Sequence, residues 1–314
     1  MSSKIDLLSL PIVSVIIATF KRKAPLKRAL ESLCAQTYSS DCLEIIVVDD
    51  NDDKTFTDDV LKIVDYYRTL ININYIKNPY NMGSAASRNV GIESSFGEYI
   101  TFLDDDDVYL PEKITRQVDY MLATNADFCI SDIDLYDEDG NLVEKRTRRY
   151  LKDFTYIPLI KNHVMYHMAG TDTLMFRSKY LQKIGGFSGN DVGDDFYLME
   201  KAINNKGKFV YLPFAGTRAT VHTRNSGISS GYKKIEGEKA LFEYKKKKYF
   251  KLLSPKEKRF VIMRHYLIIA YAYWRSNMYS STLCFLLLSF SIAPAQCIYE
   301  IYGIYGIKNR IQEV

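Results

Sequence analysis

The chain has 314 residues, of which 47% are hydrophobic and 25% charged, and its net charge is +4. This length fits one large domain with an extension, and the composition fits neither a disordered protein nor a general nucleic-acid binder. The five cysteines show no CxxC or metal-ligand spacing, and residues 1–6 lack the layout of a signal peptide. Both features predict a reduced, cytoplasmic location.

Two apolar runs near the N-terminus are expected to form buried strands. Residues 12–18 (IVSVIIA) are continuously apolar apart from one serine, which is typical of a parallel strand, and the loop 19–22 (TFKR) follows. Pro25 then opens a helix with apolar side chains spaced along one face. The second run, 43–48 (LEIIVV), ends in the acidic stretch 49–53 (DDNDD). Each predicted strand therefore ends in polar or charged side chains.

The next segments continue this alternation of helix and strand. They are a helix over 60–67, a strand over 72–77, a helix over 85–97 and a strand over 99–103. Such an alternation predicts a doubly wound α/β sheet, in which ligands bind beyond the carboxyl ends of the strands. The polar clusters at 19–22, 49–53 and 104–107 should therefore meet at one edge of the sheet.

Four aspartates, Asp104, Asp105, Asp106 and Asp107, directly follow the strand predicted over 99–103. Adjacent carboxylates at the end of a buried strand raise one another's pKa unless a cation lies among them. Mg²⁺ or Mn²⁺ would neutralise them, because these ions bind carboxylate oxygens and keep substrate phosphates as further ligands. The alternative is an acidic surface loop, and the buried strand before the cluster favours the metal site.

The sequence lacks the known phosphate-binding loops. It has no GxxxxGK[ST] motif and no GxGxxG after the first strand, which excludes the P-loop and classical dinucleotide-binding classes. Loop 19–22 has no glycine amides to wrap a diphosphate, but it could hold a base or a ribose. Arg88, at the start of the third helix, is either a helper at this site or a solvated helix residue.

The sequence of the second half of the predicted domain gives weaker evidence for its structure and for site residues. A helix is expected over 117–123, a strand over 127–133 and a hairpin turn over 137–141. Arg146, Arg148 and Arg149 are expected in a solvated loop, with contact to an anionic acceptor as the alternative. His163 and His167 are spaced to share a helix face, but without a HExxH glutamate they do not predict a zinc site.

Four stretches resemble, in order, the motifs of family 2 glycosyltransferases of the GT-A fold. They are 12–22 (IVSVIIATFKR), 44–51 (EIIVVDDN), 81–91 (NMGSAASRNVG) and 97–107 (GEYITFLDDDD). The resemblance spans about residues 10–230. It implies a doubly wound mixed sheet with a Rossmann-like nucleotide-binding half and an acceptor half.

The resemblance also implies roles for side chains that would bind a nucleotide-sugar donor. Thr19 and Asp50 would contact the base, Arg22 would lie beside it, and Asp105 would face the ribose. The whole donor-binding set is Thr19, Phe20, Arg22, Asp50, Arg88 and Asp105.

The family's DxD motif falls on Asp104 and Asp106, and the resemblance implies that Asp106 is the principal ligand of Mn²⁺ or Mg²⁺. His222 stands in a stretch that resembles the family's histidine-to-serine segment, where it would help to bind the metal or the diphosphate. Ser226 or Ser229 would lie in a closing loop of the same segment.

Asp194 and Asp195 precede a helical stretch, where carboxylates often do no more than cap the helix. The family has an acidic pair at this point, usually Glu-Asp, whose Asp is the general base. Lys201, where the family often has Arg, favours Asp195 as the base, with Asp194 beside it. Sugar transfer with inversion needs such a group, because the acceptor hydroxyl must lose its proton opposite the leaving diphosphate.

The composition changes after residue 232. Lysines are frequent from 233 to 258, and the apolar runs 266–274 and 283–292 follow them. The stretch between Arg275 and Glu300 carries no charge, but its polar residues and Pro294 make it a poor transmembrane helix. An interfacial helical hairpin on an anionic membrane surface fits better. The alternative is packing against the catalytic domain or against a second subunit in a homodimer.

The sequence thus predicts a GT-A catalytic domain over 1–232, with a nucleotide-sugar-binding half (10–110) and an acceptor half (111–232). Residues 233–314 are expected to form a membrane-associating or dimerising extension. The expected function is inverting, metal-dependent sugar transfer from a nucleotide-diphosphate donor, with a UDP-sugar favoured. The expected acceptor is a glycan or a lipid-linked hydroxyl in the synthesis of O-antigen, capsule or another surface glycan. The expected location is the inner face of the cytoplasmic membrane. The alternatives are a sugar nucleotidylyltransferase and a non-catalytic nucleotide- or carbohydrate-binding protein.

Overall fold

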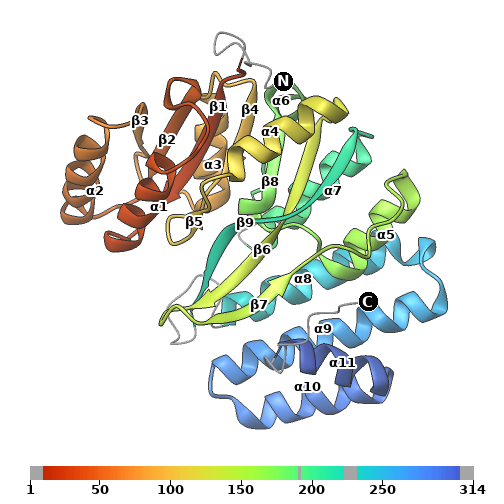
Figure 1. Cartoon of the computed structure of the whole chain (residues 1–314). Helices are drawn as coiled ribbons and strands as arrows, with labels where there is room; N and C mark the ends of the chain where they lie inside the picture. The colour runs from red at the N-terminus through yellow and green to blue at the C-terminus, as the bar shows by residue number, and fades with distance from the viewer. Residues whose placement is uncertain (1–9, 190–191, 223–231, 305–314) are drawn as a thin grey trace.

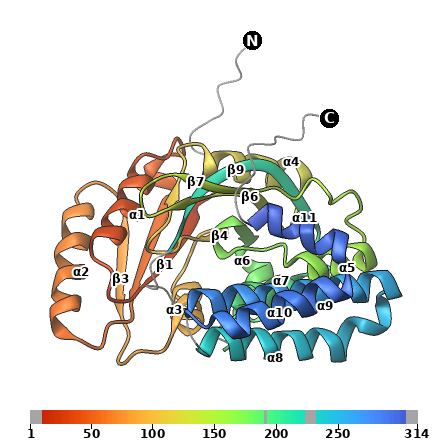
Figure 2. The same ribbon diagram turned by 90° about the horizontal axis from the view of Figure 1, so that it is seen from below.

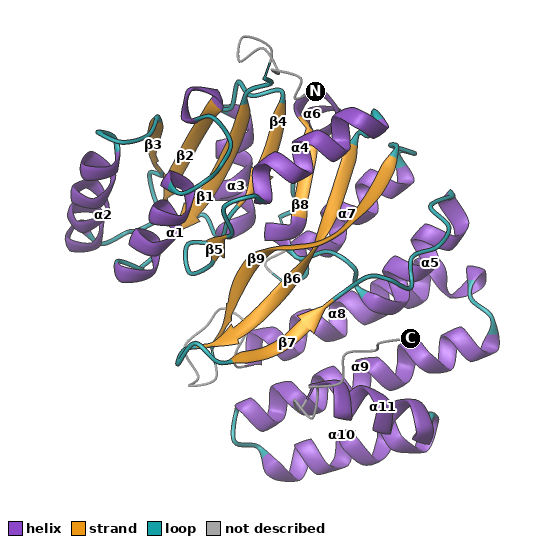
Figure 3. Cartoon of the chain, viewed as in Figure 1, coloured by secondary structure: helices purple, strands orange, loops and turns teal. Residues whose placement is uncertain are grey.

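The computed structural model describes residues 10–189, 192–222 and 232–304. Within these residues, nine strands form one sheet in the order β3-β2-β1-β4-β8-β6-β9-β5, with β7 paired to β6 (Figure 3). The strands are β1 Val13–Thr19, β2 Leu43–Asp49, β3 Ile73–Lys77, β4 Tyr99–Phe102, β5 Val108–Tyr109, β6 Phe128–Asp137, β7 Leu142–Arg146, β8 Leu174–Arg177 and β9 Phe209–Val221. The sheet is mixed, because β8 runs antiparallel to both β4 and β6 while β1 to β4 are parallel.

Helices cover both faces of this sheet (Figure 1). They are α1 Ala24–Cys34, α2 Lys54–Tyr67, α3 Ser84–Glu93, α4 Lys113–Thr124, α5 Tyr156–Tyr166, α6 Ser178–Ile184 and α7 Asp194–Asn204. Side chains alternate along β1, so Val15 and Ile17 join a core with α1, α2 and α4, whereas Ile16 joins a second core with α3, α5, α6 and α7. The doubly wound mixed α/β sheet predicted from the sequence is therefore confirmed.

The parallel register brings the carboxyl ends of three strands to one edge. Thr19 lies opposite Asp49 in the β1–β2 pair, and Ile16 lies opposite Phe102 in the β1–β4 pair. Helix α3 comes very close to β1 here, because a Cβ on Gly91 would lie 2.5 Å from Cγ2 of Ile16. The polar clusters that follow β1, β2 and β4 are thus neighbours, as predicted.

In the second half, β6 runs to Asp137, past the strand expected over 127–133, and turns into β7 at the predicted hairpin. The expectation of a solvated loop is wrong for Arg148, which is buried, whereas Arg146 and Arg149 are exposed. The Nε of Arg148 donates to the carbonyl of Met168 (2.9 Å), and its Nη1 donates to the carbonyl of Arg146 (2.8 Å). These partners satisfy a guanidinium that could not otherwise be buried.

The C-terminal region forms the helices α8 Tyr232–Tyr249, α9 Pro255–Arg275, α10 Tyr279–Ile292 and α11 Pro294–Ile304. Helix α9 is joined to α5 by an ion pair between Lys161 and Glu257 (2.9 Å) and by a hydrogen bond from Arg264 to the carbonyl of Met165 (3.0 Å). Helix α10 lies beyond α9, on the side away from the sheet (Figures 1 and 2). Across the residues described, the search for a helix both long and apolar enough to cross a bilayer finds none.

Candidate active site

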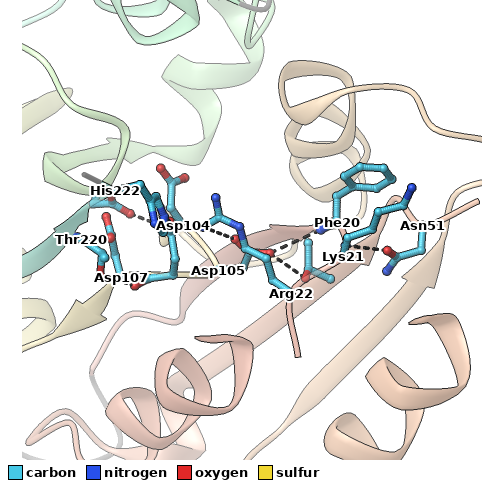
Figure 4. Close-up of polar contacts among 12 residues, drawn as sticks. Phe20, Lys21, Arg22, Asn51, Asp104, Asp105, Asp107, Thr220 and His222 are labelled. Atoms are coloured by element: carbon cyan, nitrogen blue, oxygen red, sulfur yellow. Dashed lines mark hydrogen bonds and ion pairs between the residues drawn. The ribbon is translucent and has the colours of Figure 1, made fainter. Parts of the chain in front are cut away.

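The first side chains of the site come from the end of β1 and the loop after β4 (Figure 4). The hydroxyl of Thr19 donates to Oδ2 of Asp105 (2.7 Å), and the backbone N–H of Phe20 donates to the same oxygen (3.3 Å). Burial raises the pKa of Asp105 to about 6, although Arg22 and the Thr19 hydrogen bond oppose the shift. Three residues of the predicted donor-binding set, Thr19, Phe20 and Asp105, therefore lie in direct contact.

Asp106 lies between a guanidinium and an imidazole. Arg22 forms an ion pair with the Asp106 carboxylate, and Nε2 of His222 lies 2.6 Å from Oδ2 of Asp106. Burial and the charge of Arg22 lower the pKa of His222, which favours the neutral imidazole that binds metals. Asp106 and His222, predicted as metal ligands from segments 116 residues apart, are thus brought together. Ser226 and Ser229 lie outside the described residues.

Arg88 connects the aspartate cluster after β4 with the acidic pair at the start of α7. Its Nη2 donates to Oδ1 of Asp104 (2.6 Å), and its Nη1 donates to Oδ2 of Asp194 (2.5 Å). Although burial disfavours a charged Arg88, the two carboxylates outweigh that effect and raise the pKa of Arg88. Burial likewise raises the pKa of Asp194 to about 6, against the attraction of Arg88. Arg88 is therefore a buried part of the site and not a solvated helix residue.

Asp195 has a partner that sequence reasoning missed. Nε2 of His167 lies 2.9 Å from Oδ1 of Asp195, which also accepts the backbone N–H of Phe196 (2.8 Å). Burial alone would raise the pKa of Asp195, but His167 and the backbone N–H of Phe196 lower it to about 2. His167 ends α5 in a left-handed conformation (φ 50°), so it leaves the helix face expected from the 163–167 spacing. Asp195 is thus held ionised and oriented.

Asp172 is a further site residue that the sequence did not indicate. Oxygens of Asp104, Asp107 and Asp172 lie within 4.8 Å of one another, a spacing suited to a metal ion. Asp172 accepts the backbone N–H of Asp104 (2.6 Å), and Asp107 accepts that of Thr220 (2.7 Å). Burial raises the pKa of Asp172 to about 7 and that of Asp107 well above its usual range. Asp172 therefore fixes the backbone at Asp104, and Asp107 joins the same loop to β9.

Asp50, which follows β2, is directed at the loop between β3 and α3 in this structure. Its Oδ1 accepts the side-chain amide of Asn78 (2.8 Å) and the backbone N–H of Met82 (2.8 Å), and its Oδ2 accepts the backbone N–H of Gly83 (2.9 Å). Asp50 thus fixes the loop that leads into α3 and Arg88. Its contact with a nucleotide base stays a prediction.

A model of glycosyl transferase family 2 matches residues 14–184, more than half of the chain. The chain belongs to glycosyl transferase family 2. An uncharacterized glycosyltransferase of Methanocaldococcus jannaschii, MJ1057, is 32% identical over 181 residues, which are 55% of this chain and 58% of that protein. The Escherichia coli UDP-Glc:alpha-D-GlcNAc-diphosphoundecaprenol beta-1,3-glucosyltransferase WfaP is 36% identical over 120 residues, 38% of this chain and 45% of WfaP. The matches therefore span about half of these relatives.

Solved structures share the fold of this family 2 chain. TarS residues 1–349 of S. aureus, in complex with UDP-GlcNAc, superimposes with a TM-score of 0.58 at 18% identity, over 86% of this chain and 89% of that one. The mannosyltransferase PcManGT of Pyrobaculum calidifontis, in complex with GDP-Man and Mn²⁺, gives a TM-score of 0.58 at 15% identity, over 94% and 81%. The chain thus has the GT-A fold, and its candidate site joins a carboxylate cluster to an oriented aspartate.

Proposed function

We propose that the chain is an inverting, metal-dependent glycosyltransferase that moves a sugar from a nucleotide-diphosphate donor, preferably a UDP-sugar, to a hydroxyl of a lipid-linked glycan in surface-polysaccharide synthesis. One observation carries this proposal: Arg88 joins Asp104 of the DxD cluster to Asp194, next to Asp195. Arg88 therefore contacts both the carboxylate cluster that would hold the donor and the acidic pair that would activate the acceptor. The donor preference rests on WfaP and on TarS, whose names include UDP-sugars.

The acidic cluster suits a divalent cation. Carboxylate oxygens and a neutral imidazole are ligands that Mn²⁺ accepts, and Asp104, Asp106 and His222 together supply both, with Asp106 and His222 in contact. These three residues would hold the ion, with Asp107 and Asp172 as the alternative partners of Asp104. When bound, the ion stabilises negative charge on the leaving diphosphate. Arg22, which pairs with Asp106, would lie beside the nucleotide.

Asp195 would remove the proton from the acceptor hydroxyl. Oδ1 of Asp195 is occupied by His167 and the N–H of Phe196, so Oδ2 is the oxygen that would receive the proton. A carboxylate with a pKa of about 2 is a weak base at rest, but the hydroxyl becomes acidic as its oxygen bonds to the anomeric carbon. His167 would keep the carboxylate aimed at that hydroxyl.

A sugar nucleotidylyltransferase fits the structure less well. Such an enzyme would need a glycine-rich loop after β1, whereas the chain has Thr19, Phe20, Lys21 and Arg22 there, and Thr19 already binds Asp105. A non-catalytic binding protein would have no need for the His167–Asp195 pair. Transfer of a sugar is therefore the function that the geometry supports best.

A donor screen tests this proposal. UDP-, GDP- and dTDP-sugars would be compared for thermal stabilisation of the protein, each with Mn²⁺ and with EDTA. We expect a UDP-sugar to raise the Tm only when Mn²⁺ is present, and Asp106→Ala to abolish this shift. Leu70→Ala, at an exposed side chain after α2, serves as the matched control that keeps it. A GDP- or dTDP-sugar that alone stabilised the protein would overturn the donor preference, and stabilisation by none would overturn the proposal.

A further inference from the structure

Helix α10 has its polarity reversed relative to a helix on the surface of a globular protein. Its two buried side chains, Thr282 and Ser289, are polar. Large apolar side chains point outward instead, namely Tyr279, Leu283, Leu287, Leu288 and Phe290. Leu283 is 59% exposed and Leu287 is 61% exposed. Surface helices normally bury such residues and expose polar ones, so the outward face of α10 is built for contact with an apolar phase.

Helix α10 packs through its two buried hydroxyls and through Phe285, whose ring lies against Tyr266 and Tyr273 on α9. The hydroxyl of Ser289 donates to the carbonyl of Met263 on α9 (2.9 Å), and the hydroxyl of Thr282 donates to the carbonyl of Met278 (3.0 Å). Both hydroxyls are therefore satisfied, and small residues let α10 lie close to α9. The exposed leucines Leu283, Leu287 and Leu288 are not required for this packing, which leaves the outward face without a role inside the described fold.

We infer that the outward face of α10 is inserted, parallel to the membrane plane, into the interfacial layer of an anionic bilayer. This inference deepens the proposed function, because it names the surface that would meet a lipid-linked acceptor. No charged residue occurs between Arg275 and Glu300, whereas Arg259 lies at the C-terminal end of α10, where its Nη2 donates to the carbonyl of Ile292 (2.7 Å). An apolar face with a cation at its border matches anionic headgroups over acyl chains.

The length and borders of α10 agree with this orientation. At 14 residues it is about 21 Å long, shorter than the roughly 30 Å hydrocarbon layer, so it would lie in the interface. Trp274 and Tyr279 stand exposed at one end, and Tyr299 stands exposed on α11 beyond the other. Aromatic side chains with a polar atom favour the boundary between headgroups and acyl chains. An interface with a second copy of the chain would not require aromatic side chains at both ends of α10. A bilayer therefore fits this face better than a second copy does.

The same surface is connected to the catalytic edge. Nη2 of Arg275, at the end of α9, donates to the carbonyl of His222 (2.5 Å), and the imidazole of His222 contacts Asp106. The end of α9, directly before the turn into α10, therefore contacts one of the proposed metal ligands. Insertion of α10 would bring the active site to the headgroup layer, where the sugar of a lipid-linked acceptor is found.

The chain's single tryptophan, Trp274, provides a direct test. Full-length protein would be mixed with phosphatidylcholine vesicles containing 30% phosphatidylglycerol, with and without brominated acyl chains. We expect co-sedimentation, a blue shift of Trp274 emission and quenching by the brominated lipid, with at least tenfold weaker binding to pure phosphatidylcholine. Absence of binding, or binding without quenching, would overturn the inference.

Variants separate the bilayer from a second copy of the chain. Leu283→Glu combined with Leu287→Glu should lower vesicle partition more than tenfold while the Tm and donor binding stay unchanged. Leu70→Glu, at an equally exposed leucine after α2, should leave partition intact. Unchanged partition in the double variant would contradict the inference. If the wild-type protein sediments as a dimer and the double variant as a monomer, the outward face of α10 is instead an interface with a second copy of the chain. Vesicle binding requires no sugar donor, so its failure is distinguishable from a failure of the donor screen.

Discussion

At the residue scale, the proposed chemistry depends on a carboxylate that is both ionised and fixed in direction. Asp195 meets this requirement through His167 and the backbone N–H of Phe196. Asp194, its neighbour in sequence, is instead paired with Arg88 and has its pKa raised to about 6. The two adjacent aspartates therefore have different environments: both oxygens of Asp194 accept hydrogen bonds, whereas among the described residues only Oδ1 of Asp195 does.

This difference predicts a separation of binding from turnover. Asp195→Asn should keep the donor affinity and lower kcat by about 10²-fold or more, because the amide cannot accept a proton. Isothermal titration with the donor and steady-state nucleotide release would measure the two quantities. Asp194→Asn is the matched control, and we expect it to weaken donor binding, since Arg88 loses a charged partner. A collapse of donor affinity with normal kcat in Asp195→Asn would make Asp195 a binding residue.

A second residue-scale prediction concerns stability against pH. His163 is fully buried, its ring stacks on Phe196, and burial lowers its pKa to about 3. Because unfolded histidine takes up a proton near pH 6.5 and folded His163 does not, stability is lost as the pH falls from about 6.5 toward 3. Between pH 7 and pH 5 this one group should cost about 2 kcal/mol. His163→Phe should reduce the pH dependence in urea unfolding by that amount, and an unchanged dependence would refute the assignment.

At the scale of elements, the position of Arg88 depends on how closely α3 approaches β1. Gly91 makes that approach possible, because an added Cβ would meet the fully buried Ile16. The same helix begins at the loop held by Asp50, so both ends of the α3–β1 contact are fixed. Arg88 thereby reaches Asp104 and Asp194 together.

Gly91→Ala should therefore destabilise the protein by about 1–2 kcal/mol, since overpacking outweighs the better helix propensity of alanine. Chemical denaturation would measure the change. Gly189→Ala, at a position with open space around it, is the matched control and should be nearly neutral. If the two substitutions change the free energy of unfolding equally, the α3–β1 contact accommodates the extra methyl group and the prediction is wrong.

The sequence predicted the strands and the carboxylates at their ends because both signals are local. The runs before Thr19 and Asp104 are apolar, and the parallel register that joins them follows from general rules of α/β sheets. The contacts of Asp172 and His167 were not predictable in this way. Asp172 reaches Asp104 across 68 residues, and His167 reaches Asp195 across 28, so tertiary packing alone brings them together.

At the scale of the whole molecule, the catalytic sheet edge and the C-terminal helices meet at His222 and Arg275. The division at residue 232 and the inner-face location stay predictions. A protein arranged in this way would transfer sugar at a membrane surface while all of its proposed donor-binding groups remain on the sheet edge. The membrane surface would then affect access to the acceptor and leave donor affinity unchanged.

The central claim is that the carboxylates after β4 and Asp195 form one metal-dependent transfer site. The most direct measurement is nucleotide release from the preferred donor, in the presence of a lipid-linked saccharide acceptor, before and after treatment with EDTA. The account predicts that release stops in EDTA, returns when Mn²⁺ or Mg²⁺ is restored in excess, and does not return in Asp106→Ala. Full release in excess EDTA would contradict it.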